Sequence, residues 1–412
     1  MLNKAVLVIL ASVFLESVSL QEQPPPKPPR GSEQEVSTPA QTETPPPLPP
    51  PPPPGLLPLK PISEIDTSGT PLAPLLFHES TLVVASQDGA VEGYLVETGE
   101  FLWKLGFPDE ELLPPRPMND KLLLSLRKGT LIFASTANGE ILQELDLPSP
   151  IDIPPLPDEN VFFLASPEGV ITRYDSQKEQ VIWKTPTNEQ ATSLAKGGDL
   201  LVVSGNESRL TAIDTNNGQI RWTFRGRGAF KAPAVFDAKT EKLYVGDSAG
   251  TFYSISAKNG KVNYRWETGG SIVSPVLLEG DTVYVISYAN TLFAYRSGKG
   301  HELWRVNLPG RPASGPVRVG VRLVVATLDG HVVEIDPMRG RRSTQPYEAP
   351  DSIRAHPSFS PPYAALTLYM GRILLLTTEM PVLETAPVEL EGPPRPPPKK
   401  ETQSEDPDAP PH

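Results

Sequence analysis

The chain of 412 residues contains no cysteine. This composition excludes disulfides, acylation of a cysteine and cysteine-based zinc sites. Long apolar stretches are also missing, because no run approaches the roughly 18 uninterrupted apolar residues of a membrane-spanning helix. Helical spacing of apolar residues is almost absent as well. We therefore expect a soluble mature protein without direct membrane insertion, which needs a partner for any attachment to a membrane.

Residues 1–19 have the three parts of a secretory signal peptide. Lys4 supplies a positive charge, residues 5–15 form a short apolar run, and Ser17 and Ser19 are small residues at the end of the segment. This pattern predicts an exported protein. We expect the periplasm first, with secretion or display at the cell surface as the alternatives.

Proline is abundant, with 51 residues, and it gathers towards the two ends of the chain. Residues 21–55 and 391–412 also carry Glu, Gln, Ser and Thr, and they offer too little apolar surface to form a core. We interpret both as disordered, extended polyproline II arms that act as spacers, rather than as ligands of a proline-binding domain. The expected division is a signal peptide at 1–19, a Pro-rich linker at 20–63, a folded domain at 64–390 and a Pro-rich tail at 391–412.

Three series of turn and strand markers repeat along the folded region at intervals of about 40 residues. The first series marks one turn of each repeat: Gly99, Gly139, Glu179, Gly218, Gly260, Gly300 and Gly340. The second marks tight turns between apolar runs: Gly89, Gly129, Gly169, Ser208, Gly250, Asn290, Gly330 and Gly371. The third is a proline inside a short strand signal: Pro74, Pro115, Pro155, Pro233, Pro275, Pro316 and Pro357.

The segments between these markers alternate apolar and polar residues or contain short β-branched runs, which is typical of strands. A repeat of about 40 residues with four short strands cannot bury both faces of its sheet alone. We therefore predict an all-β fold, an eight-bladed β-propeller with four-stranded antiparallel blades. The eighth blade lacks a clear fourth strand, and either residues 382–390 or residues 56–65 should close the ring.

The repeat at residues 212–222, AIDTNNGQIRW, closely resembles the repeat of the PQQ-like, tryptophan-docking β-propellers. The resemblance extends over nearly the whole folded region. In that family the Trp lies on the outer strand of a blade and docks over a neighbouring turn, which implies a structural docking role here. The residues at this position are Trp103, Trp183, Trp222 and Trp304, while Gln143, Tyr264 and Thr344 replace the Trp, and Trp266 lies two residues further along.

The resemblance implies two classes of function. One is a quinoprotein dehydrogenase that holds pyrroloquinoline quinone and calcium on the propeller axis. The other is a non-enzymatic scaffold, similar to the propeller of the outer-membrane β-barrel assembly machinery. The chain lacks the vicinal cysteine pair of many quinoproteins and shows no evident group of Glu, Asn and Asp for calcium. We therefore expect no catalytic residues, no cofactor and no metal, and the PQQ-dependent oxidoreductase remains the alternative.

Two apparent catalytic signals have simpler interpretations. The sequence GDSAG at residues 246–250 matches a nucleophile elbow in spelling, but it joins strand to strand, so Ser248 is expected to be a turn residue. The five histidines are scattered singly and lack the spacing of a zinc helix.

The net charge of −12 disfavours nucleic acid as a partner. Positive charge nevertheless gathers at Arg221 and in the connection from the fourth to the fifth blade. Because that connection combines two glycines, cations and an aromatic residue, we predict a candidate partner-binding face there, made of Arg225, Arg227, Phe230 and Lys231. Ordinary solvated loop charge is the alternative interpretation of the cations. A second cluster, Arg339, Arg341 and Arg342, is expected on the opposite face of the disc. The expected partner is an envelope protein of unknown identity that binds a monomeric propeller.

Overall fold

The computed structural model describes residues 56–72, 74–118, 120–354 and 356–378. All of them belong to one compact unit of the chain. The expected signal peptide, most of the Pro-rich linker, the candidate closing segment at residues 382–390 and the Pro-rich tail lie outside the described residues.

Within the described residues, the strands form eight four-stranded antiparallel sheets, each of which is one blade. The first blade contains β2 (Leu76–His78), β3 (Thr81–Ala85), β4 (Ala90–Leu95) and β5 (Phe101–Gly106). The second contains β6 (Leu112–Met118), β7 (Lys121–Leu126), β8 (Thr130–Ser135) and β9 (Ile141–Asp146). The third contains β10 (Leu156–Asp158), β11 (Val161–Ala165), β12 (Val170–Asp175) and β13 (Gln180–Pro186). The fourth contains β14 (Ala191–Gly197), β15 (Leu200–Gly205), β16 (Arg209–Asp214) and β17 (Ile220–Arg225).

The second half of the ring follows the same order. The fifth blade contains β18 (Val235–Asp237), β19 (Lys242–Gly246), β20 (Thr251–Ser256) and β21 (Val262–Glu267). The sixth contains β22 (Leu277–Glu279), β23 (Thr282–Ser287), β24 (Thr291–Arg296) and β25 (Glu302–Asn307). The seventh contains β26 (Val317–Val319), β27 (Arg322–Ala326), β28 (His331–Ile335) and the short β29 (Tyr347–Glu348). The eighth contains β30 (Ser358–Ser360), β31 (Tyr363–Thr367), β32 (Ile373–Thr378) and β1 (Leu59–Ile65), with a single 3-10 turn, η1 (Tyr369–Gly371), between β31 and β32.

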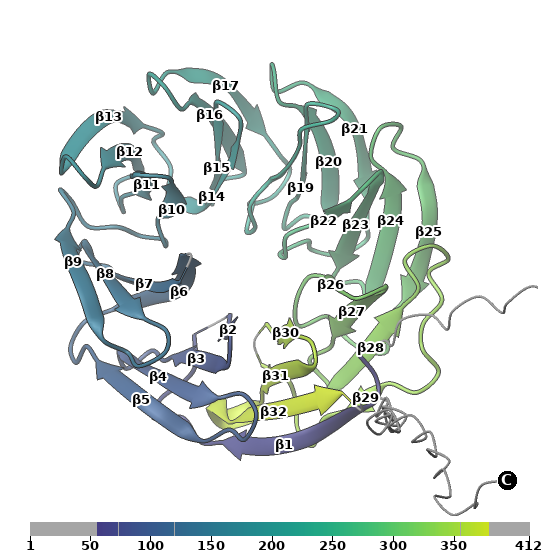
Figure 1. Cartoon of the computed structure of the whole chain (residues 1–412). Coiled ribbons are helices and arrows are strands. Elements are labelled where there is room, and N and C mark those ends of the chain that lie inside the picture. The colour runs from purple at the N-terminus through teal and green to yellow at the C-terminus, as the bar shows by residue number, and fades with distance from the viewer. Residues whose placement is uncertain (1–55, 73, 119, 355, 379–412) are drawn as a thin grey trace, which may run out of the picture. The chain divides into compact units, whose positions relative to one another are not determined.

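The blades are arranged in a ring, with the first strand of each blade toward the centre and the last strand on the circumference (Figure 1). This confirms the eight-bladed, all-β propeller predicted from the repeat. The antiparallel order gives the disc two faces. The connection face carries the links between blades and the turns from second to third strand. The hairpin face carries the turns from first to second and from third to fourth strand.

The ring is closed by the N-terminal one of the two candidate segments. β1 pairs antiparallel with β32, with Leu59 opposite Thr378 and Ile65 opposite Ile373, so that the first and last described strands lie side by side (Figure 1). The folded domain therefore starts before residue 64, the boundary expected from the sequence, because the outer strand of the eighth blade lies in the stretch interpreted as linker.

Turn geometry explains the two glycine-rich series. All seven residues of the first series and all eight of the second have a positive φ, including Glu179 (50°), Ser208 (67°) and Asn290 (57°). Glycine is favoured at such positions because it has no Cβ to clash in the left-handed region. The proline series needs a correction, because six of its seven prolines lie one or two residues before the inner strand, and only Pro115 lies inside one, β6. A proline has no N–H to donate to a ladder, which suits the residues that lead into a strand.

Apolar residues from facing sheets form the core between neighbouring blades. The second strands are buried along almost their whole length, as in β3, β11 and β15. The third strands are also largely buried, and together they supply most of the interblade clusters. Among the described residues, no helix is long and apolar enough to cross a membrane.

Candidate interaction site

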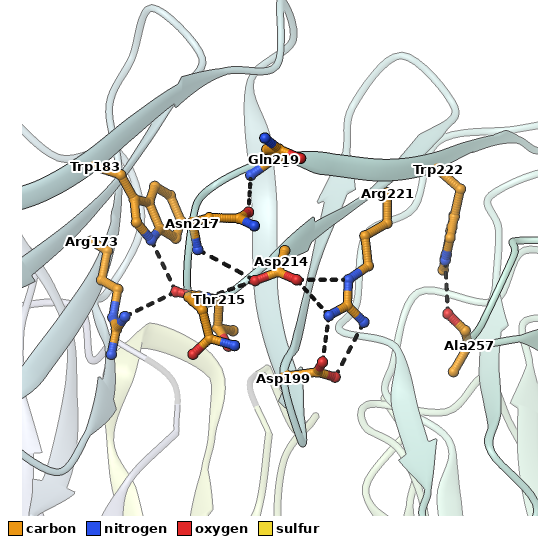
Figure 2. A network of polar contacts seen from close by, with 11 residues as sticks. Arg173, Trp183, Asp199, Asp214, Thr215, Asn217, Gln219, Arg221, Trp222 and Ala257 are labelled. Carbon is orange, nitrogen blue, oxygen red and sulfur yellow. Dashed lines mark hydrogen bonds and ion pairs between the residues drawn. The ribbon is translucent and has the colours of Figure 1, made fainter.

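Four tryptophans on outer strands contact the next blade in the same way. Each indole N–H donates to a backbone carbonyl in the third-to-fourth-strand turn of the neighbouring blade: Trp103 to Thr136 (3.1 Å), Trp183 to Thr215 (2.9 Å), Trp222 to Ala257 (2.8 Å) and Trp304 to Pro337 (3.0 Å). Figure 2 shows the second and third of these contacts. Each ring also covers the turn glycine, so closely that a Cβ there would lie 2.5 to 2.7 Å from the indole: Gly139, Gly218, Gly260 and Gly340.

A β-bulge precedes this position in each of the first six blades. The ladder between third and outer strand skips one residue directly before the docking position, for example Arg221 before Trp222. A bulge redirects the side chains around it, and here it turns the following residue toward the next blade. The four tryptophans lie at four different joints of the ring and do not converge on one ligand.

The joints without a tryptophan at this position differ from one another. Between the fifth and sixth blades, the Tyr264 hydroxyl donates to the Ser297 carbonyl, and Trp266 packs against Tyr295 with ring centroids 4.5 Å apart. This aromatic pair fills the joint in place of a single Trp. The signal for it in the sequence was the occurrence of two aromatic residues, Tyr264 and Trp266, two positions apart. Beside Gln143, by contrast, a hollow of about 510 Å³ opens between the second and third blades.

Arg221 does not belong to the cluster in which the sequence placed it. It lies at the start of β17, near the hairpin face, whereas the connection follows the other end of that strand. Its guanidinium donates to Asp214 (Nε to Oδ2, 3.1 Å) and to Asp199 (Nη1 to Oδ1, 3.2 Å), as Figure 2 shows. These hydrogen bonds from Arg221 lower the pKa of both carboxyl groups. The bulge frees Arg221 for this bridge between two hairpin turns of the fourth blade.

A buried carboxylate, Asp247, holds the connection between β17 and β18 in place through hydrogen bonds. Asp247, with no exposed surface, accepts hydrogen bonds from the backbone N–H of Arg227 and of Gly228 (both 3.0 Å). The Tyr253 hydroxyl donates to the same carboxylate (2.8 Å). Asp247 also accepts two N–H groups of its own turn, from Ala249 (3.0 Å) and Thr251 (2.9 Å). The carboxylate thus ties the connection to the second-to-third-strand turn of the fifth blade.

Sequence reasoning missed Asp247, although a signal existed. The residue three positions before the second-series marker is Ser or Thr in four other repeats, at Ser86, Ser166, Ser287 and Thr327. Only the fifth repeat has a carboxylate there. Ser248, next to it, lies in a turn from strand to strand, and its backbone N–H donates to the Ala229 carbonyl (2.9 Å) of the connection.

Phe230 is not part of an exposed face, which corrects the expectation from the sequence. The side chain has no exposed surface and packs in the core between the fourth and fifth blades, with its ring centroid 6.3 Å from that of Phe224 and 6.1 Å from that of Tyr253. Its backbone N–H donates to Gly205 (3.1 Å). The ring is buried because the interblade space below the connection is apolar and large enough to hold it.

The three cations of the predicted face are exposed on the connection face. Arg227 forms an ion pair with Glu267, and Lys231 donates to the Asn206 side chain. The Arg225 side chain has no hydrogen-bond or ion-pair partner among the described residues. The structure therefore brings Arg225, Arg227 and Lys231 together on a connection whose backbone is fixed by Asp247 and Phe230.

The propeller axis does not fit a calcium-bound quinone. A cavity of about 510 Å³ there is lined by prolines and aliphatic side chains from the first, sixth, seventh and eighth blades, including Pro74, Pro275 and Val317. Among the described residues, its lining contains no carboxylate. Its polar side chains are Ser314, Arg318 and His356, and Arg318 donates to Glu279 (3.2 Å). Calcium requires several oxygen ligands, and a quinone with several carboxylates requires more cationic or N–H donors than this lining offers.

A family model described as outer membrane protein assembly factor BamB matches residues 87–225, 233–349 and 264–372. Among curated relatives with the same description, the protein of Legionella pneumophila (strain Paris) is 26% identical over 168 residues, which cover 40% of this chain and 42% of that protein. The aligned part thus spans less than half of that relative's length. The protein of Bordetella pertussis (strain Tohama I) is 20% identical over 293 residues, which cover 66% of this chain and 74% of that protein.

The crystal structure of BamB from Moraxella catarrhalis has the same fold, with a TM-score of 0.60 at 17% identity over 78% of this chain and 98% of that one. The family model matches well over half of the chain, on the same repeats that carry the turn glycines and the docking tryptophans. This chain therefore belongs to the PQQ-like β-propeller family described as outer membrane protein assembly factor BamB.

Proposed function

We propose that this protein is an exported, non-enzymatic scaffold of the cell envelope that binds a protein partner in outer-membrane protein assembly. Membership of the BamB family supports the process. The proposed binding site is the connection between the fourth and fifth blades. The observation that supports it is that Arg225, Arg227 and Lys231 are exposed there, while buried groups hold the backbone in place.

Such a connection suits recognition for two physical reasons. Its backbone is already ordered by the Asp247 carboxylate and by the buried ring of Phe230, so binding sacrifices little conformational entropy there. Arginine is also enriched among the residues that contribute most to protein interfaces. Since the exposed groups are cationic, the complementary partner surface is acidic.

The test is a double charge reversal, Arg225→Glu with Arg227→Glu, in the full chain. The expected result is a loss of at least tenfold in affinity for the envelope partner, with a melting temperature within about 2 °C of wild type, because exposed ion pairs contribute little to folding. Affinity capture with quantitative mass spectrometry gives the first measurement, and circular dichroism gives the second.

Reversal of Arg341 and Arg342 to Glu provides the matched control, since both residues are exposed and lie at a turn on the hairpin face. The control should bind as wild type does. Equal losses from the two pairs would show a diffuse charge effect, and a loss from the control alone would place the partner on the opposite face. Either outcome contradicts the proposed site.

A further inference from the structure

The joint between the seventh and eighth blades, which we call the seam, differs in structure from the other joints of the ring. No turn connects β32 to β1, because the two strands come from opposite ends of the described chain. Thr344 stands where four other blades have a docking Trp, and β29 has two residues where the outer strands of the other blades have six or seven. The seam therefore lacks a docking Trp and a full outer strand on the seventh blade, and it lacks a turn from third to fourth strand on the eighth blade.

The half of the seam near the hairpin face is filled by the residues that lead into β1. Leu56 has no exposed surface and belongs to the apolar cluster between the two blades. The backbone N–H groups of Leu56 and of Leu57 donate to the Glu334 carboxylate, the second at 3.1 Å.

The other half of the seam is an open groove of about 590 Å³ between β1 and β29. It is lined by Pro61, Ile62, Ser63, Glu64, Tyr347, Glu348, Pro350 and Leu374. The lining thus combines an aromatic ring, two prolines and two aliphatic side chains with two carboxylates. The Glu348 side chain is 76% exposed, and its one ion-pair contact among the described residues is a long one, 3.9 Å from His331.

Negative charge is present directly beside the aromatic ring. Burial raises the pKa of the Tyr347 phenol, and the Glu64 carboxylate raises it further. Arg372 pairs with Glu64 at 2.9 Å and neutralises part of this charge, which leaves Glu348 as the more available carboxylate. A ligand that fits this groove has an apolar, extended backbone and positive charge.

We propose that the groove binds residues 393–400 of this same chain, PPRPPPKK. Proline-rich segments bind grooves lined by aromatic and apolar side chains, because their polyproline II backbone is already extended and loses little entropy on binding. The segment combines five prolines with Arg395, Lys399 and Lys400. These three cations complement the carboxylates at the rim of the groove.

The chain is long enough for this contact to form within one molecule. Thr378, the last described residue, lies opposite Leu59 at the seam. Fifteen residues lead from Thr378 to residue 393, and they span up to about 50 Å when extended. The part of the groove on β1 begins at Pro61, two residues from Leu59, and ends at Glu64, five residues from it, which is about 7 to 17 Å along the strand. Tethering at this distance gives the segment a millimolar effective concentration at the groove, so even a weak site is occupied.

The absence of cysteine allows a direct test in the full chain. Two introduced thiols have no other thiol in the same molecule to pair with, so the rate of the intramolecular disulfide reports how often the two meet. The test pair is Gln345→Cys, which is exposed two residues before Tyr347 of the groove, with Thr402→Cys, two residues beyond Lys400. The control pair keeps Thr402→Cys and places the other thiol at Ser360, which is exposed in the turn of the eighth blade next to Thr378.

The expected result is that the groove pair closes at least tenfold faster than the control pair, although Ser360 is nearer to the point where the described chain ends. Replacing Arg395, Lys399 and Lys400 with Glu should abolish this difference, and Glu348→Lys should reduce it several-fold. Equal rates for the two pairs, or a difference that survives the charge reversal, would overturn the proposal. Disulfides that form mainly between two molecules would assign the groove to a second copy instead, which also contradicts it.

Discussion

Removing the indole ring of Trp222 should destabilise the protein by about 3 to 5 kcal/mol, the usual range for a large aromatic side chain replaced by alanine in a core. The side chain is 8% exposed and belongs to the cluster between the fourth and fifth blades. Its N–H donates to Ala257, a residue that is itself buried, so the substitution also leaves a carbonyl without its donor. With an unfolding entropy of about 2.1 cal/mol/K per residue over about 320 residues, the melting temperature falls by roughly 4–7 °C.

Thermal unfolding followed by circular dichroism measures this shift, and Trp222→Phe separates its two parts. Phenylalanine keeps most of the ring but has no N–H, so its cost should be near the 0.5–1.5 kcal/mol of one hydrogen bond. Gly260→Ala gives a second check, because its Cβ would lie 2.7 Å from the indole of Trp222 at a residue with φ of 71°. In the Trp222→Ala background the clash is gone, so Gly260→Ala should cost less there. An unchanged melting temperature for Trp222→Ala, or full additivity with Gly260→Ala, would refute the docking role of Trp222.

Two further predictions concern the supporting groups Arg221 and Asp247, and a third concerns the quinone cofactor. Arg221→Gln should lower the melting temperature at pH 7 and have a smaller effect at acidic pH, because Arg221 lowers the folded-state pKa of Asp199 and Asp214, and that stabilisation is lost as the pH falls through these lowered pKa values. A pH series of melting curves measures it, and a constant difference at all pH values contradicts it. Asp247→Asn should destabilise by about 2–4 kcal/mol and weaken partner binding, because an amide cannot accept all the donors that converge on the carboxylate; denaturant unfolding and affinity capture test this, and wild-type behaviour in both would show that the connection is held otherwise. Pyrroloquinoline quinone with Ca²⁺ should give no dye-linked oxidation of alcohols or sugars and no heat of tight binding, and calorimetry that shows one tight quinone site would support an oxidoreductase instead.

The repeat made the fold predictable from sequence. A positive φ at a tight turn restricts the residue types there, so Gly99, Gly218 and their equivalents marked each blade at a constant interval. The turn glycines did not indicate which segment closes the ring. Residues 56–65 and 382–390 both have short apolar patterns, and only the ladder between β1 and β32 distinguishes them.

The candidate site was less predictable, because it depends on contacts between distant residues. Phe230 follows two glycines and two cations, a pattern typical of an exposed loop, yet its ring enters the core because Phe224 and Tyr253 leave space between the blades. Asp247 acquires its role from N–H groups about 20 residues earlier in the chain. Local composition identified where the connection lies and that its cations are exposed, but not that the Phe230 ring points inward.

Site-specific photocrosslinking in cells tests directly whether the connection face of the propeller binds an envelope partner. A photoreactive amino acid at position 225, with the same residue at position 341 as control, reports which face of the propeller meets a partner in the envelope. We expect position 225 to give one dominant adduct, identified by mass spectrometry as a component of outer-membrane protein assembly. Position 341 should give no such adduct. An adduct of this kind from position 341 alone, or no adduct with an assembly component from position 225, would contradict the account.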